Sequence, residues 1–361
     1  MVCVRYRPRQ PRASPVWQVL HDHANKLPAL HPEAAAAIVA FLACGDLHAG
    51  FTRLHCPDCG HEFLLAFTCK QRGLCASCHQ RRTLIEGAFI ADEICAPVPH
   101  RHLVLTLPRL IRHTFKFDRA RLGELYHAAH SAITAWLRQH TGQPEGQPGL
   151  VVAVQTFGDF LFWRHRGFSV DAGEAPPAAD DASGRRRLAE YLLRAPFSLE
   201  KITYHAEAGS VLCRSDRHWS TKRNFEVFSA SQFIAALLDQ VPPKGVPQVR
   251  TYGWYSNKSR GLRQRTAGAA AGKLHAPPAC PRRRRAAWRE LIQRVWGADP
   301  LKCPLCSGLL RPIAVVETKA GILAILMPLG LARSHERHFA LGPPRPEVAV
   351  LIDAERRLRS N

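Results

Sequence analysis

The chain has 361 residues, of which 50 are Lys or Arg and 29 are Asp or Glu, so its formal net charge is +21 and its pI is near 10.1. Such an excess attracts polyanions, most commonly nucleic acid; the alternative is a generally basic protein without a DNA-binding face. A hydrophobic content of 46% excludes a disordered basic tail, and the length predicts two or three domains.

The amino-terminal stretch MVCVRYRPRQPRASPVW is charged and lacks the apolar segment of an export signal. The longest apolar stretches, 34–44 and 321–332, are shorter than the roughly eighteen residues that suggest a membrane span. We therefore expect a cytoplasmic, nucleoid-associated protein with no membrane partner. In that compartment twelve cysteines favour metal binding over disulfides.

Hydrophobic periodicity and turn residues predict alternating helices and strands along the chain. We expect helices at 15–47, 84–95, 118–140, 185–194 and 229–241, strands at 100–108, 149–160 and 224–228, and a hairpin at 198–215 that turns at 207–209. A flexible linker at 267–285 and a short helix at 288–296 follow, and the last twenty residues are Pro- and Arg-rich.

Two C-x-x-C knuckles, CPDC and CASC, are separated by fifteen residues. This is the spacing of a structural tetrathiolate zinc site, with Cys56, Cys59, Cys75 and Cys78 as its ligands. Other residues near the knuckles could replace one of the four: Cys44, Cys69, His61 and His79. Cys44 and Cys69 read first as small buried hydrophobic residues.

A third knuckle, Cys303 and Cys306, forms half of a further zinc site. His335 and His338 could complete it, although the gap is long and contains a predicted helix. Otherwise the knuckle has no partner.

The segment RTYGWYSNKSRGLRQR places Tyr252 and Tyr255 three residues apart, on one face if it is helical. A phenol can attack a phosphodiester, and flanking cations can bind the neighbouring phosphates. Both tyrosines are candidate nucleophiles, and the alternative is packing on DNA or in a core. The candidate DNA-binding cations are Arg250, Lys258, Arg260, Arg263, Arg265, Lys222 and Arg223.

Tyrosine attack on a phosphodiester commonly also needs a divalent metal ion. His100 and His102 would share one face of a strand and are the obvious local pair of ligands, although a surface pair is the simpler reading. His127 and His130 read as a solvated helix face.

Several motifs occur together and in order: CPDCGHEFLLAFTCKQRGLCASCH, HRHLVLTLP, GLVVAVQTFGD, GWYSNKSRG and DPLKCPLCSG. With them the chain, from about residue 17 to 330, resembles bacterial transposases of the insertion sequence 91 family. The resemblance implies an amino-terminal zinc-binding domain and a two-tyrosine HUH nuclease domain. It also implies rolling-circle transposition, in which a tyrosine nicks one strand at the element's end and stays linked to the 5′-phosphate. The partner is then DNA of the element's ends, single-stranded or hairpin.

Two departures from the family pattern matter. The His-hydrophobic-His motif expected beyond 155–159, which would hold Mg²⁺ or Mn²⁺, does not occur downstream, and an internal deletion at 160–162 accounts for its loss. The first of two tyrosines four apart falls on Thr251, whereas Tyr255 keeps its place. We therefore expect a transposase with impaired catalysis. Two alternatives are a non-enzymatic zinc-dependent DNA-binding protein that regulates or competes at element ends, and an active nuclease that uses His100 and His102.

The expected fold class is α+β. A helical zinc-knuckle domain at 15–97 precedes a transposase domain at 98–265, whose antiparallel sheet and helices are the remnant of an HUH nuclease. The stretch 266–361 holds the linker, a short zinc-ribbon-like segment and the tail.

Overall fold

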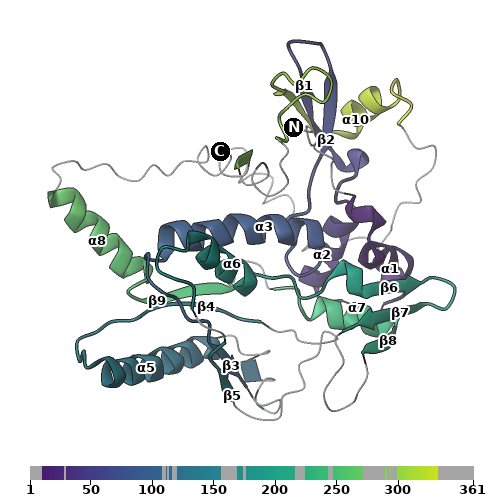
Figure 1. The fold of residues 1–361 in the computed structure, drawn as a ribbon. Helices are drawn as coiled ribbons and strands as arrows, with labels where there is room; N and C mark the ends of the chain where they lie inside the picture. The colour runs from purple at the N-terminus through teal and green to yellow at the C-terminus, as the bar shows by residue number, and fades with distance from the viewer. Residues whose placement is uncertain are drawn as a thin grey trace. The chain divides into compact units, whose positions relative to one another are not determined.

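The computed structural model describes residues 10–27, 30–107, 111, 114–115, 120–155, 169–173, 176–215, 224–242, 247–270, 289–290, 293 and 299–331. It is a mixed helix and sheet protein, as expected for the α+β class (Figure 1). The chain divides into two compact units that are both discontinuous in sequence, whereas the sequence analysis divides it into three consecutive stretches. Unit 1 comprises 1–79, 197–244 and 296–361, and unit 2 comprises 80–196 and 245–295.

No helix in the described part of the chain combines the length and the apolar character needed to cross a membrane.

Unit 1 contains two three-stranded antiparallel sheets, with strand orders β10-β1-β2 and β6-β7-β8. Its strands are β1 (Phe51–His55), β2 (Glu62–Ala66), β6 (Ile202–His205), β7 (Ser210–Arg214), β8 (Phe225–Ser229) and β10 (Arg311–Val316). Its helices are η1 (Pro11–Ala13), α1 (Pro15–His23), η2 (Ala24–Lys26), α2 (Pro32–Leu42), η3 (Leu47–Ala49), η6 (Leu199–Lys201), α7 (Ala230–Leu238), α10 (Lys319–Leu326) and the start of α3 (Ala76–Phe89).

Helix α1 packs against α2, α7 and β6. It begins where the side chain of Ser14 caps it by accepting the N–H of Trp17. Val16, Val19 and Leu20 are at most 1% exposed, and their spacing places them on one face of the helix. This apolar face explains why α1 lies in the core of unit 1.

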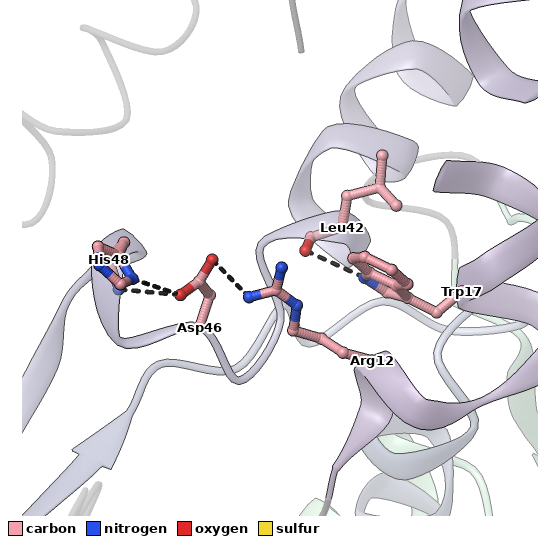
Figure 2. Close-up of polar contacts among 5 residues, drawn as sticks. All are labelled: Arg12, Trp17, Leu42, Asp46 and His48. Atoms are coloured by element: carbon pink, nitrogen blue, oxygen red, sulfur yellow. Dashed lines mark hydrogen bonds and ion pairs between the residues drawn. The ribbon is translucent and has the colours of Figure 1, made fainter. Parts of the chain in front are cut away.

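A network of polar contacts fixes the turn that follows α2 (Figure 2). The indole N–H of Trp17 donates to the carbonyl of Leu42 (3.1 Å), and Arg12 forms an ion pair with Asp46 (2.8 Å). Asp46 also accepts a hydrogen bond from the backbone N–H of His48 (3.0 Å). The network ties the chain before α1 to the exit of α2, and so restrains the residues between Leu42 and Asp46.

Unit 2 contains two separate pairs of antiparallel strands, β3–β5 and β4–β9. The strands are β3 (Val104–Thr106), β4 (Gly149–Ala153), β5 (Ser169–Asp171) and β9 (Val249–Gly253). The helices are the rest of α3, η4 (Ile90–Ile94, a π-helix), α5 (Arg121–Thr141), α6 (Ala182–Leu192) and α8 (Asn257–Ala270).

The core of unit 2 lies where α6 meets η4. Ile90, Ile94 and Ala189 are buried there together with the ring of Tyr255, and Val151 of β4 packs against them. A candidate nucleophile is thus part of the apolar core, which bears directly on its chemistry.

Most predicted elements are confirmed, with ends that shift by a few residues, but the predicted helix 15–47 is divided into α1 and α2, each followed by a short 3-10 helix. The hairpin forms between β6 and β7 and turns at 206–209, and the side chains of Ser229 and Gln232 form the capping box of α7. The predicted strand 100–108 was too long, because β3 spans only Val104–Thr106. Helix α8 also extends to Ala270, into the stretch predicted as linker. The rest of that linker, most of the predicted helix 288–296 and the tail lie outside the described residues.

Candidate functional site

Four cysteines of unit 1 meet at the start of α3: Cys44, Cys69, Cys75 and Cys78, here called the α3 cluster. Cys44 follows α2, Cys69 follows β2, and the CASC knuckle leads into α3. The sulfur of Cys78 is 3.7 Å from that of Cys44 and 3.5 Å from that of Cys69, and the sulfurs of Cys44 and Cys75 are 3.9 Å apart. Every pair lies within 4.8 Å.

Polar groups point at the sulfurs of the α3 cluster. The backbone N–H of Cys69 donates to the sulfur of Cys44 (3.4 Å), and that of Gln71 donates to the sulfur of Cys69 (3.5 Å). Hydrogen bonds among the four thiols lower the pKa of Cys78 and raise the pKa of Cys69 and of Cys75. The two backbone N–H donors favour the thiolate, which is the form that a metal binds.

A second set of four cysteines joins distant parts of unit 1: Cys56, Cys59, Cys303 and Cys306, here called the β10 cluster. Cys56 and Cys59 lie in the turn between β1 and β2, whereas Cys303 and Cys306 lie just before β10. The sulfurs of Cys56 and Cys306 are 3.4 Å apart, and those of Cys59 and Cys303 are 3.6 Å apart. All four lie within 4.8 Å of one another.

Both clusters fit a tetrahedral zinc ion. Four thiolates at the usual Zn–S bond length of about 2.3 Å stand about 3.8 Å from one another at the corners of a tetrahedron. The sulfur–sulfur distances given above, 3.4–3.9 Å, match that spacing. A disulfide would need about 2.05 Å. Among the residues that the structure describes, these two clusters are the groups of three or more His, Cys, Asp or Glu side chains arranged to hold a metal ion.

The predicted grouping of Cys56, Cys59, Cys75 and Cys78 in one site was wrong. The structure assigns the first pair to the β10 cluster and the second pair to the α3 cluster. The physical reason is β2, which follows the first knuckle and pairs along β1, so the chain leaves the first knuckle before it forms the second.

The cysteines and histidines considered as replacement zinc ligands differ in whether the structure places them in a cysteine cluster. Cys44 and Cys69 belong to the α3 cluster, so reading them as buried hydrophobic residues missed half of a site. The Nδ1 atom of His79 accepts the backbone N–H of Gly73 (3.0 Å) and orders the loop before α3. His335 and His338 lie outside the described residues.

The two candidate tyrosines do not share a helix face, so that prediction was wrong. Tyr252 lies in β9, and Tyr255 follows in a tight turn before α8 begins at Asn257. Gly253 has a φ of +57°, and the N–H of Tyr255 donates to the carbonyl of Tyr252 (3.2 Å). The N–H of Trp254 donates to the carbonyl of Pro148 (3.0 Å), which anchors the turn to the start of β4.

Tyr255 is buried, with 4% of its surface exposed. Its hydroxyl oxygen accepts the backbone N–H of Ala96 (3.2 Å) and lies 2.7 Å from Nε2 of His100, with which it forms a hydrogen bond. The rings of His100 and Tyr255 also stack, with centroids 5.8 Å apart. Burial raises the pKa of Tyr255 and lowers the pKa of His100, so a neutral phenol beside a neutral imidazole is the favoured state.

Tyr252 has a different environment, against α5. Its ring lies 6.0 Å from that of Tyr126, 5.4 Å from that of His127 and 6.0 Å from that of His130. Burial lowers the pKa of His130. His127 and His130, which were expected on a solvated helix face, therefore lie beside the ring of Tyr252.

The sequence predicts that His100 and His102 share one face of a strand. The structure differs, because both residues precede β3. His100 contacts Tyr255, whereas the ring of His102 meets the edge of Tyr191, with centroids 5.2 Å apart.

Two family models match this chain, one over the zinc-binding part and one over the part that holds the tyrosines. Residues 16–107 match the family model described as "Transposase zinc-binding domain" of the insertion sequence 91 type, and residues 94–262 match the model described as "Putative transposase". The chain belongs to the insertion sequence 91 family of transposases. A relative from Pseudomonas savastanoi pv. phaseolicola, "Transposase for insertion sequence element IS801", is 29% identical over 194 residues. That alignment covers 50% of this chain and 45% of the relative, so the chain spans less than half the length of this relative. No solved structure matches.

The two family matches cover different candidate functional residues of this chain. The α3 cluster lies wholly within the zinc-binding match, and both tyrosines lie within the second match. Cys303 and Cys306 lie beyond both matches.

Residues 252–256 form the turn between β9 and α8, here called the tyrosine turn, and the predicted DNA-binding cations that the structure describes lie on these two elements. Lys258, Arg260, Arg263 and Arg265 lie on α8, and Arg250 of β9 lies over the ring of Tyr126, 5.4 Å from its centroid. Lys222 and Arg223 lie outside the described residues.

Trp254 is a member of this region that the sequence analysis missed. Its indole is 43% exposed, and the guanidinium of Arg263 lies 4.0 Å from the ring centroid. Its place between Tyr252 and Tyr255 in a basic segment was the available signal, because exposed aromatic side chains among cations are typical of single-strand binding.

Proposed function

We propose that this chain binds single-stranded DNA of insertion-sequence ends, as a transposase with an impaired nicking step. The observation that carries the proposal is the position of Tyr255, whose hydroxyl is buried and held by Ala96 and His100. The same turn presents a basic helix and an exposed indole. Binding and cleavage therefore make different demands on this turn.

Cleavage requires the phenol oxygen of Tyr255 to lose its proton and to reach a phosphorus atom in line with the leaving oxygen. Burial opposes both requirements, because it raises the pKa of Tyr255 and keeps phosphate away from the hydroxyl. His100 could accept the phenol's proton through Nε2, but the ring stacking that aligns it also covers the tyrosine. In this arrangement the contact between His100 and Tyr255 favours packing of the core over attack on a phosphodiester.

The Mg²⁺ or Mn²⁺ expected for the family's chemistry prefers carboxylate, carbonyl and water oxygens as ligands. The metal-holding groups found in the described residues are cysteine clusters, which suit zinc and lie in unit 1. The residues around Tyr255 therefore do not fit that ion. The stretch 156–168, where the sequence analysis places the deletion, lies outside the described residues.

We infer that the strand pairs β3–β5 and β4–β9 are the remnant of an HUH nuclease sheet. Among the described residues they are separate two-stranded pairs, and the stretch with the inferred deletion follows shortly after the end of β4 at Ala153. A central sheet that has lost strands would leave such isolated pairs.

Helix α8 supports the DNA-binding part of the proposal. Lys258 and Arg265 are exposed, and Arg263 is held beside Trp254 by a hydrogen bond from its Nη1 to the Trp254 carbonyl (2.9 Å). The helix start is ordered because the N–H of Ser259 donates to the side chain of Ser256 (3.2 Å). Cations that track a backbone beside an aromatic face are the usual means of holding a single strand.

Replacing Trp254 with alanine should weaken binding of single-stranded DNA by about 1–3 kcal/mol, the usual value of one base stacked on an aromatic ring. Duplex binding should change less, because duplex bases are already stacked. The measurement is fluorescence anisotropy with single-stranded and duplex oligonucleotides at one salt concentration. Trp136→Ala on α5 is the matched control, since this residue is 57% exposed and its ring stacks on His140. Equal losses of affinity for single-stranded DNA in the two variants would show that Trp254 is not part of the DNA-binding surface.

The nicking proposal is tested with single-stranded DNA carrying the ends of the resident element, incubated with protein and Mg²⁺ or Mn²⁺ and separated on a denaturing gel. We expect salt-sensitive binding, with a log–log slope of about −0.7 per phosphate contacted, and a covalent adduct that is far weaker than that of an active family member and absent from Tyr255→Phe. A protease-sensitive adduct as strong as that of an active family member, and lost in Tyr255→Phe, would show an active nuclease and overturn the proposal.

The second candidate function is a non-enzymatic DNA-binding protein that competes with an active transposase for element ends. Burial of the Tyr255 hydroxyl favours it as well, because the tyrosine then serves the core alone. The two candidates differ in residual activity: a weak adduct well below that of an active family member indicates impaired catalysis, and none at any protein concentration indicates the competitor.

A further inference from the structure

The carboxy-terminal segment 299–331 is built into the amino-terminal part of unit 1. Strand β10 pairs with β1 in antiparallel register, with Phe51 opposite Val316 and His55 opposite Arg311. Strand β1 is thereby the central strand of the β10-β1-β2 sheet. The family's zinc-binding match ends at residue 107, so this strand comes from outside the matched domain.

Two apolar clusters join the same distant segments. Leu54 of β1 is buried with Leu310, the residue before β10. Phe51 is buried with Ile322 and Leu326 of α10. Each of these side chains is at most 4% exposed, so removal of the carboxy-terminal segment would uncover the central strand on both its pairing edge and its packed side.

The two knuckles of the β10 cluster repeat one backbone design. In the first, the N–H of Cys56 donates to the carbonyl of His61 (2.9 Å); in the second, the N–H of Cys303 donates to that of Gly308 (2.7 Å). The residue after the second cysteine of each knuckle has a positive φ, +72° at Gly60 and +66° at Ser307.

The knuckles also lie close together. A Cβ on Gly308 would overlap the carboxylate of Asp58, in the first knuckle, and would lie 3.2 Å from the sulfur of Cys306. Two equivalent turns that face each other at this range place four sulfurs around one point, as a tetrahedral ion requires.

We propose that the β10 cluster binds a second structural zinc ion, which fastens the carboxy-terminal segment to the zinc-binding domain. The ligands are Cys56 and Cys59 from one knuckle and Cys303 and Cys306 from the other. Each thiol releases its proton to the solvent as its sulfur binds the ion. The zinc-binding domain of this chain is then assembled from both ends of the sequence, with Cys59 and Cys303 separated by 244 positions.

The proposal is independent of nicking, and zinc content tests it directly. Protein purified without chelator should contain two zinc ions per chain by elemental analysis and native mass spectrometry. Cys306→Ser should contain one, and Cys213→Ser should keep two, because Cys213 is a buried thiol of β7 outside both clusters. One zinc ion in the wild-type protein, or two in Cys306→Ser, would overturn the proposal.

A measurement on the wild-type chain keeps the test valid if Cys306→Ser does not fold. Cobalt(II) added to metal-free protein should saturate thiolate-to-metal charge-transfer absorption at two equivalents per chain. Saturation at one equivalent would contradict a second tetrathiolate site.

The fastening role has a test of its own. A protease site inserted after Gly272, outside the described residues, allows the linker to be cut in the otherwise complete chain. The carboxy-terminal fragment should then copurify with the rest in the wild type and separate in Cys306→Ser. Copurification in both would show that strand pairing suffices without the ion, and separation in both would show that the ion does not fasten the segment.

Discussion

Replacement of Cys78 with serine is expected to remove one zinc ion per chain and to unfold the region around α2 and the start of α3. The sulfur of Cys78 lies within the α3 cluster, 3.7 Å from the sulfur of Cys44 and 3.5 Å from that of Cys69. Serine supplies neither a soft ligand nor a thiolate. Structural zinc contributes on the order of 10 kcal/mol to small domains, which is comparable to the whole stability of a typical domain.

The expected result is checked by zinc content and by hydrogen exchange of residues 30–79. Exchange should become fast around α2 and the knuckle in Cys78→Ser, whereas α5 in unit 2 should keep its protection. Cys213→Ser is again the control, because it removes a buried thiol from unit 1 without touching a cluster. Full zinc content together with unchanged exchange in Cys78→Ser would contradict a metal-binding role for the α3 cluster.

The zinc sites illustrate what local spacing can and cannot predict. A C-x-x-C turn is a local structure, so each of the three knuckles could be recognised from the sequence. The choice of partner is tertiary. Cys303 reaches Cys59 because β10 pairs with β1, and that pairing leaves no mark in the spacing of the cysteines.

Cys44 and Cys69 were harder to assign because each is a single cysteine without a knuckle. Cys44 is brought to the site by the turn after α2, which Trp17, Arg12 and Asp46 hold in place. The number of cysteines was a usable signal, because the six cysteines of the three knuckles together with Cys44 and Cys69 are enough for two sites of four ligands.

The tyrosine turn was mispredicted for a different reason. A spacing of three residues puts side chains on one face only if the segment is helical, and Gly253 already interrupts it. In the structure β9 ends there, and the next residues turn back to meet Pro148. Elements with strong periodicity, such as α5 and α7, were predicted correctly because no long-range contact is needed to define them.

Replacement of Gly253 with alanine is expected to disrupt the tyrosine turn at a cost that exceeds about 4 kcal/mol, the range in which a single substitution points to a specific structural fault. Gly253 combines a φ of +57° with a close approach of neighbouring atoms. A Cβ there would overlap the carbonyl oxygen of Pro148, which accepts the Trp254 N–H, and would lie 2.9 Å from Nε2 of His130. The backbone has to move, and Tyr255 moves with it.

Gly142→Ala separates backbone strain from steric overlap. Gly142 caps α5 with a φ of +67°, close to that of Gly253, but no atom lies within 4 Å of the Cβ that alanine would add. This control should lose only the roughly 1–2 kcal/mol of a left-handed non-glycine residue. Denaturant unfolding gives the difference in stability, and hydrogen exchange of 249–256 locates it. Equal losses in the two variants would mean that the turn does not hold β9 against β4, and the buried position of Tyr255, which depends on that turn, would have to be abandoned.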